Sequence, residues 1–201
     1  MLAALFCRLN RRRLRDPRFA ALFDPPPAGE CVSLDCETTS LDARSAELLS
    51  IAAVPVRDGR VLLSEKLVLT VRPEGPIDAG TIPIHRLRPQ DVAEGLPAHE
   101  ALARLLDFIG PRPLVGYYLE FDLAIINRHL KPWIGIALPN RAIDVSTLYY
   151  DRHVSAYRPE VDLSLDAMLE TLQLPRWPRH DALGDAVTAA LIYLKLAANR
   201  R

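Results

Sequence analysis

The apolar segments of this chain change periodicity along its length, and their order restricts the fold. Short β-rich runs come first, at 31–35, 48–56 and 61–71, and the turn dipeptide Asp58-Gly59 lies between the last two. A turn of this kind between apolar runs is typical of a β-hairpin. Helical spacing then dominates, with one further strand candidate, LVGYY at 114–118, between helical segments. This order predicts an α/β fold, in which a mixed β-sheet is flanked by helices.

The helical segments carry start and stop signals of familiar kinds. Four of them are expected: one from Pro97 to Gly110, one over 121–130 that is ended by Pro132, one capped by Asp162 or Ser164, and one over 183–194. The last has an apolar stripe at the i, i+3, i+4 spacing of a helix that packs on a core.

Positive charge is concentrated at the N-terminus. Residues 1–30 contain six arginines and three acids, whereas the whole chain has 25 basic and 25 acidic residues and no net charge. A Pro-Pro-Pro run at 25–27 then interrupts any helix. We therefore divide the chain into a basic N-terminal arm with a Pro-rich linker, 1–29, and a single folded domain, 30–201. The arm is either a solvated, partly helical leader or a basic segment that holds a phosphate backbone or a protein partner.

The composition excludes several classes of protein. Apolar residues make up 49% and charged residues 25%, as in soluble globular domains. The three cysteines, Cys7, Cys31 and Cys36, form no CxxC pair, which disfavours a disulfide framework or a zinc site and favours a reducing compartment. No apolar run approaches the roughly 20 residues of a membrane span. We expect a cytoplasmic protein without a membrane partner.

Two acids follow the first predicted strand, in the stretch LDCETTSLD. Asp35 and Glu37 are two residues apart, so on extended chain they project from one face while Cys36 points the other way. Neighbouring carboxylates repel unless a cation lies between them. Mg²⁺ and Mn²⁺ prefer such oxygen ligands. Taken alone, the pair fits either a metal site or solvated acids in a turn.

Further acids occur at later element ends. Asp122 stands at the start of an apolar helix, where the helix dipole alone favours an acid. Asp185 lies near the start of the last helix, five residues after His180. Five helical steps would place these two side chains about 140° apart. If Asp181 caps the helix, however, His180 lies on the preceding loop and can reach a shared site. The alternative is an ordinary surface histidine.

Together, LDCETTSLD, GYYLEFD and HDALGD resemble the three motifs of the DEDDh 3′–5′ exonucleases of the ribonuclease H-like superfamily. These include the proofreading subunit of the bacterial replicative polymerase. The resemblance runs from about Cys31 to Leu196 and includes IPIHRL at 82–87 and the PQDV that follows. It implies a ribonuclease H-like fold and release of nucleoside 5′-monophosphates from 3′ ends of DNA or RNA, in single-stranded form. The process would be proofreading, repair or nucleic-acid turnover.

The resemblance also assigns roles to individual residues. It implies that four acids hold two Mg²⁺ or Mn²⁺ ions: Asp35, Glu37, Asp122 and Asp185. His180 would be the general base that takes a proton from the attacking water. The backbone at Thr38 and the side chain of Leu41 would contact the terminal nucleotide, although Leu41 could equally be a packing residue.

The chain departs from the family pattern in two places. Tyr117-Tyr118 stands where relatives commonly have His-Asn, which affects contacts that help to set substrate choice. The sequence also ends at Arg201, without the tail by which the proofreading subunit binds its polymerase. We therefore expect an exonuclease that acts alone or is recruited through its N-terminal arm. The alternatives are a nuclease of short oligonucleotides and a non-catalytic nucleic-acid or polymerase-binding module.

Overall fold

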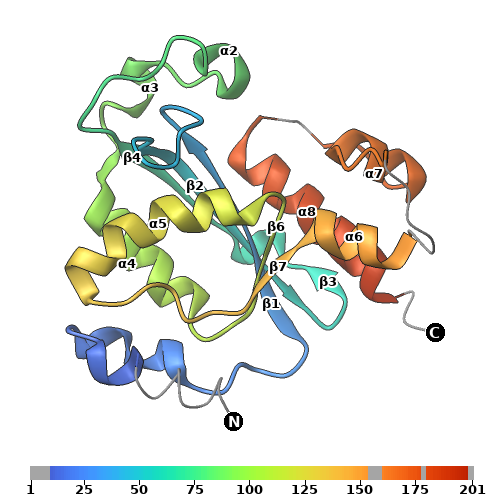
Figure 1. The fold of residues 1–201 in the computed structure, drawn as a ribbon, viewed down its shortest axis with the longest axis horizontal. Coiled ribbons are helices and arrows are strands. Elements are labelled where there is room, and N and C mark those ends of the chain that lie inside the picture. Colours follow the sequence, from blue (N-terminus) through green and yellow to red (C-terminus); the bar gives the residue numbers. More distant parts are fainter. Residues whose placement is uncertain (1–9, 154–159, 178–179, 199–201) are drawn as a thin grey trace.

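A mixed β-sheet forms the centre of the molecule (Figure 1). The computed structural model describes residues 10–153, 160–177 and 180–198. The sheet order in this part of the chain is β5-β4-β2-β1-β6-β7, and β3 pairs with β2. The strands are β1 (Glu30–Thr38), β2 (Leu48–Arg57), β3 (Arg60–Val61), β4 (Leu67–Arg72), β5 (Leu96–Pro97), β6 (Leu114–Gly116) and β7 (Ala142–Asp144).

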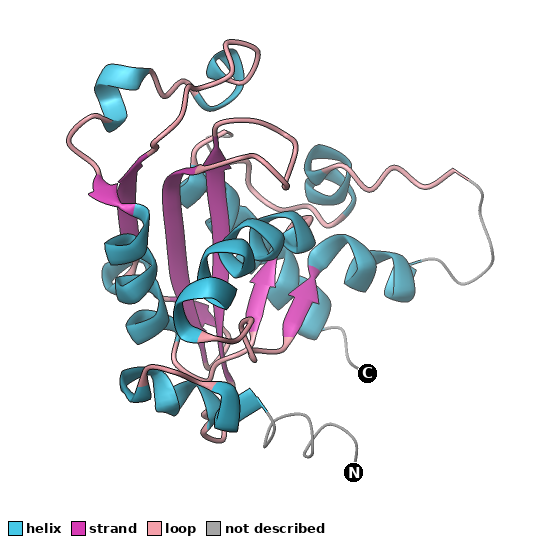
Figure 2. Ribbon diagram, turned by 60° about the vertical axis from the view of Figure 1, so that its left-hand side comes forward, coloured by secondary structure: helices cyan, strands magenta, loops and turns pink. Residues whose placement is uncertain are grey.

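Strand direction determines which chain segments meet at each edge of the sheet. Strand β2 is antiparallel to both β1 and β4, whereas β1, β6 and β7 run parallel to one another. Figure 2 shows the arrows of β6 and β7 side by side. The carboxyl ends of β1, β6 and β7 therefore lie at one edge, the position where open α/β sheets bind ligands.

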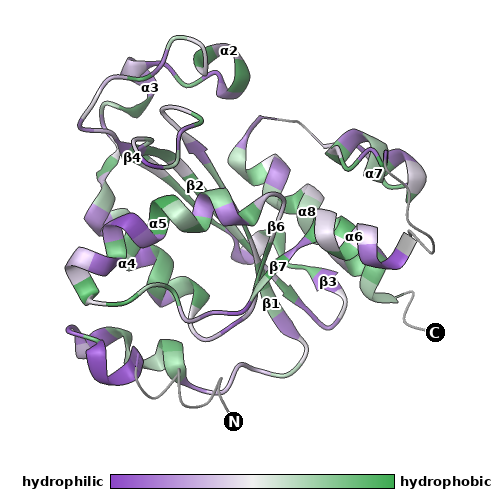
Figure 3. Cartoon of the chain, in the orientation of Figure 1, coloured by the Kyte–Doolittle hydropathy of each residue, from purple (hydrophilic) through white to green (hydrophobic). Residues whose placement is uncertain are grey.

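Helices cover both faces of the sheet, as predicted. Helices α4 (Ala98–Ile109) and α5 (Leu119–Ile134) pack on one face, and α8 (Ala182–Ala198) packs on the other. Helices α6 (Val145–His153) and α7 (Leu165–Thr171) lie against α8, and the short α2 (Ile82–His85) and α3 (Pro89–Val92) connect β4 to β5. In Figure 3 most of α8 is hydrophobic, which fits its position on a sheet that is buried on both faces. None of the described helices is long and apolar enough to cross a bilayer.

Most predicted elements are present, with shifted boundaries. Ser164, and not Asp162, caps α7, because its Oγ accepts the Ala167 N–H at 3.3 Å. The run at 61–71 is not one extended segment: it divides into β3, the 3-10 turn η2 (Leu63–Glu65) and β4. The strand predicted at 114–118 stops at Gly116.

The prediction that Pro132 ends the helix was wrong. Helix α5 continues to Ile134 and stops at Gly135, whose φ of 82° is in the left-handed region that favours glycine. The N-terminal segment supplies donors to this last turn. The Arg15 N–H donates to the Ile134 carbonyl at 2.9 Å, and Arg15 Nη1 donates to the Pro132 carbonyl at 2.8 Å. These bonds satisfy carbonyls that a helix end leaves open.

The described part of the N-terminal segment packs against the rest of the chain. Its 3-10 helix η1 (Pro17–Phe23) buries Phe19 and Leu22 in the main apolar core. The Phe19 ring meets Trp133 of α5 edge-on, with centroids 5.4 Å apart. Arg18 pairs with Asp107 of α4. Residues 10–24 are thus held on α4 and α5, while the division of the chain at residue 30 stays a prediction.

Candidate active site

A cavity of about 750 Å³ opens where β1, β6 and β7 end. All seven residues to which a role was assigned from the sequence line it, together with Cys36, both tyrosines of the β6–α5 turn, and residues from the starts of α5 and α6. The full lining is Asp35, Cys36, Glu37, Thr38, Leu41, Tyr117, Tyr118, Glu120, Phe121, Asp122, Asp144, Ser146, Thr147, His180 and Asp185. Segments as far apart in sequence as β1 and α8 therefore meet in one cavity.

The end of β1 brings three carboxylates together. Oxygens of Asp35, Glu37 and Asp185 all lie within 4.8 Å of one another. The pairing of β1 with β2 shifts register between Glu37 and Thr38, an irregularity of the kind that redirects side chains beside functional sites. Cys36, between the two acids, is buried in the main apolar core and also lines the cavity. The expected projection of Asp35 and Glu37 from one face is consistent with this close group.

The acids strongly perturb one another. Burial raises the pKa of Glu37 to about 7, and the charges of Asp185 and Asp181 add to the increase. Asp122 lies outside the close group of three, and burial followed by the charge of Glu37 holds its pKa well above the usual range. The Cys36 thiol and backbone N–H donate to Asp122, which opposes that increase. Such a cluster is costly without positive charge, and its oxygen donors fit a hard divalent cation such as Mg²⁺ or Mn²⁺.

The start of α8 fixes the position of His180. Asp181 precedes the helix and caps it, since its Oδ2 accepts the Gly184 N–H at 3.2 Å. His180 therefore lies just before the helix, in a left-handed conformation with φ of 60°. Its backbone N–H donates to Asp185 Oδ2 at 3.1 Å. The backbone of His180 is thus tied to one carboxylate, and its exposed imidazole lines the same cavity.

The turn after β1 presents the two remaining residues of the sequence prediction. Thr38 is buried, and its Oγ1 donates to the Ser40 carbonyl at 2.9 Å. Leu41 is 75% exposed, so it is not a core residue. The Arg128 guanidinium of α5 donates to the carbonyls of Ala43 and Ala46, which holds the following part of the turn against α5.

Asp144, at the end of β7, was missed by sequence reasoning. Its Oδ2 accepts the Leu119 N–H at the start of α5 at 2.9 Å, and its Oδ1 accepts the Ser146 N–H at the start of α6, also at 2.9 Å. One carboxylate thus fixes the first turns of two helices at the edge of the cavity. The Asp-Val-Ser sequence after a short apolar run was the available signal, because Asp is a preferred helix cap.

Comparison with known proteins identifies the family. The exonuclease family model (RNase_T) matches residues 32–193. A DNA polymerase III PolC-type protein of Caldanaerobacter subterraneus subsp. tengcongensis is 27% identical over 168 residues, which cover 84% of this chain and 12% of the relative. The DNA polymerase III subunit epsilon of Aquifex aeolicus is also 27% identical over 168 residues, covering 84% of this chain and 80% of that subunit.

A solved structure shows the same fold. Exonuclease X, in complex with 5′ overhanging duplex DNA, superposes with a TM-score of 0.68 at 22% identity, covering 85% of this chain and 92% of that one. The chain belongs to the exonuclease family and has a ribonuclease H-like fold, which confirms the resemblance of the three motifs. The matched domain family is one of exonucleases. It spans only about an eighth of the PolC-type relative's length.

Proposed function

We propose that the chain is a 3′–5′ exonuclease that removes nucleotides one at a time as nucleoside 5′-monophosphates. The observation that supports this proposal most is the group of three carboxylates within 4.8 Å of one another, in a cavity that Asp122 and His180 also line. A strand of DNA is the favoured substrate, because the relatives are DNA polymerase proteins and exonuclease X was solved with DNA.

In this proposal the acids hold two Mg²⁺ or Mn²⁺ ions, through Asp35, Glu37, Asp122 and Asp185. When bound, such ions offset the negative charge of the phosphate and of the departing 3′ oxygen. The carboxylates orient the ions and, once deprotonated, neutralise their charge. A neutral chain can then bind a polyanion without a cradle of arginines.

His180 is the proposed general base. Its imidazole is exposed in the cavity, and its backbone is tied to Asp185. A ring nitrogen can take the proton of the attacking water, since an unperturbed imidazole titrates near neutral pH. Thr38 and Leu41 are proposed to contact the terminal nucleotide from the turn after β1. Leu41 offers an exposed apolar side chain for that contact.

The process that this nuclease serves is proposed to be DNA proofreading or repair, as the names of the polymerase relatives suggest. The arginines of the N-terminal segment are the proposed contact for a protein partner. Several of them lie on the described part of the segment, which packs on α4 and α5 and leaves Arg11, Arg12 and Arg13 exposed.

The test is stepwise shortening of a 5′-labelled 20-mer in Mg²⁺ or Mn²⁺. Matched single-stranded DNA, RNA and duplex substrates, and a dinucleotide, would define the substrate class. We expect a ladder of products that EDTA abolishes. Asp185→Ala should abolish the ladder, and His180→Ala should slow it by about 10²- to 10⁴-fold, the usual contribution of a general base.

His99→Ala is the matched control for the histidine variant. His99 is exposed on α4, is absent from the cavity lining, and should keep wild-type activity. Pure, folded wild-type protein that shortens none of these substrates with either ion would overturn the proposal. Binding of nucleic acid that survives loss of all four acids, without cleavage by the wild type, would indicate a binding module instead.

A further inference from the structure

Tyr118, in the turn between β6 and α5, is an exposed aromatic residue in a strained backbone conformation. Its φ and ψ are 48° and 36°, in the left-handed region, and its side chain lines the cavity. The residue is 59% exposed, so burial of the ring does not offset this strain. A bulky residue with positive φ persists only where the surrounding structure imposes it, and such residues cluster at functional sites.

The surrounding structure does impose this conformation. The Leu119 N–H, directly after Tyr118, is held by Asp144 Oδ2, and the Tyr118 carbonyl accepts the Phe121 N–H at 3.0 Å. Before the turn, Gly116 passes so close to β1 that a Cβ atom there would lie 2.9 Å from the Leu34 carbonyl oxygen. The same contacts that place the start of α5, and with it Asp122, therefore hold Tyr118 at the cavity.

The neighbouring tyrosine supports the ring. The Tyr117 and Tyr118 ring centroids are 4.4 Å apart with an interplanar angle of 44°. Tyr117 is partly buried against the apolar cluster that contains Val145 and Tyr149 of α6, so it is anchored in the domain. Tyr118 thus rests on an anchored ring and still exposes most of its own surface.

The chemistry of the cavity indicates what this ring contacts. The carboxylates serve the phosphate chemistry in the proposed function, so the base of a nucleotide needs apolar contacts elsewhere in the cavity. Leu41, Phe121 and Tyr118 add apolar surface to the same cavity. A flat, exposed aromatic side chain beside a phosphodiester site fits a nucleobase, because stacking needs only a π face and tolerates any sequence.

We propose that Tyr118 stacks on the base of one of the last three nucleotides at the 3′ end of the substrate, an inference that rests on the proposed function. A base inside a duplex has both faces covered by its neighbours, so this contact favours a single-stranded or frayed 3′ end. Tyr118 is then a binding residue that sets substrate preference, beside the residues that carry the chemistry.

The experiment combines ring removal with base removal. Wild type, Tyr118→Phe, Tyr118→Ala and Tyr118→Asn would be compared on a single-stranded 20-mer and on three copies with an abasic site at the first, second or third 3′ position. Asparagine lacks the ring but adopts the left-handed region readily. Tyr118→Asn therefore separates loss of stacking from backbone strain if Tyr118→Ala folds poorly.

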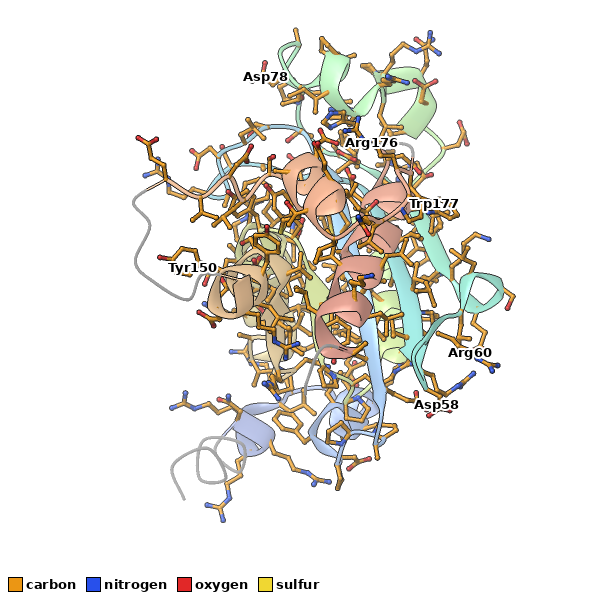
Figure 4. The ribbon with its side chains drawn as sticks, turned by 90° about the vertical axis from the view of Figure 1, so that its right-hand side faces the viewer. Asp58, Arg60, Asp78, Tyr150, Arg176 and Trp177 are labelled. Carbon is orange, nitrogen blue, oxygen red and sulfur yellow. The ribbon has the colours of Figure 1, made fainter. Side chains whose placement is uncertain are left out.

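On the intact strand we expect Tyr118→Ala and Tyr118→Asn to lower kcat/KM by about 5- to 150-fold, the range for loss of one base–aromatic stack. The loss should lie mainly in KM, and Tyr118→Phe should retain activity. At the one abasic position that removes the stacked base, the wild type and the ring-less variants should differ by less than about twofold. Tyr150→Ala is the matched control, since Tyr150 projects outward from α6 and is absent from the cavity lining (Figure 4).

Two kinetic results would overturn the inference. An equal loss on all four substrates would assign Tyr118 a purely structural role, and faster cleavage by Tyr118→Asn would mean that the ring obstructs the site. Binding of strands that carry 2-aminopurine at the 3′ positions, in Ca²⁺ instead of Mg²⁺, gives a readout without turnover. We expect the wild type to quench the 2-aminopurine fluorescence and Tyr118→Asn to abolish this quenching. Equal quenching by the two proteins would contradict the stack. A wild type that cleaves nothing refutes the proposed function itself.

Discussion

Strand β1 begins with Glu30 and has a second glutamate, Glu37, directly before its last residue, and the two have opposite surroundings. At its start, Glu30 Oε2 lies 3.7 Å from Arg112 Nη1, and the two side chains are only 20% and 17% exposed. Arg112 also donates its Nε to the Ile109 carbonyl at 3.0 Å, at the end of α4. Seven residues further along, Glu37 is surrounded by other acids and has a pKa of about 7.

The difference shows how the fold treats an acid with a structural partner and an acid that is proposed to serve chemistry. The charge of Glu30 is neutralised within the molecule by Arg112, from the segment after α4. The charges of Glu37, Asp35 and Asp185 oppose one another, so this end of β1 lowers the stability of the fold until a cation arrives. Sites of this kind are less stable than they could be because their activity requires like charges close together. Removing one of these charges should therefore raise the stability and lower the activity.

The largest expected effect comes from Asp185→Asn. The asparagine Oδ1 can still accept the His180 N–H, so the local geometry should survive while one like charge disappears. We expect exonuclease activity to fall by at least about 10³-fold, as for loss of a group central to charge stabilisation. In EDTA the melting temperature should stay constant or rise. Activity assays and thermal unfolding of the same preparation check this prediction, and a variant that loses both activity and stability would contradict it.

The second prediction concerns pH and is of intermediate size. The pKa of Glu37 is raised from 4.5 to about 7 in the folded chain, so between these values the folded state binds more protons than the unfolded state. In EDTA the free energy of unfolding should therefore fall as pH rises from about 4.5 to about 7. For a partly exposed group we expect a decrease on the order of 1–3 kcal/mol. Buried Asp122, with a raised pKa, acts in the same direction.

Chemical denaturation across this pH range measures the effect. Glu37→Gln should flatten the profile, whereas Glu30→Gln should leave its slope intact. Mg²⁺ should stabilise the protein more at pH 8 than at pH 5.5, because binding requires deprotonated carboxylates. Stability that rises across the window in EDTA would show that the folded state does not bind the Glu37 proton more tightly than the unfolded state.

The same contrast explains how far the sequence could predict the structure. Glu37 and Asp185 could be selected as candidates because acid spacing and position at an element end are local signals, and the cap by Asp181 that places His180 before α8 was also visible locally. The partner of Glu30 was not visible, because Arg112 follows α4 and meets β1 only in the folded sheet. Asp144 was not predicted for a similar reason. Its bond to Leu119 depends on the parallel pairing of β6 and β7, which are strands of three residues each.

Tertiary contacts also determine how far some elements extend and where the backbone is strained. The run at 61–71 is apolar at both ends, but Leu63–Glu65 form a 3-10 turn between the two segments that pair with β2. Pro132 carries a genuine stop signal, but Arg15 satisfies the carbonyls around it, and no local pattern links these residues. The exposure of Leu41 and the left-handed Tyr118 likewise depend on how the turns at the cavity are held.

The smallest expected effect is at the other end of β1. Glu30→Gln removes the charge that faces Arg112 but keeps the size of the side chain and a carbonyl oxygen near the guanidinium. Because the pair is 3.7 Å apart and partly exposed, we expect a loss of only about 0.5–1 kcal/mol in the free energy of unfolding. The change in stability should be seen at pH 8 in EDTA, and kcat/KM in Mg²⁺ should be unchanged. A loss of activity would mean that this end of β1 is coupled to the carboxylates, and that the two ends do not have the separate roles that their surroundings indicate.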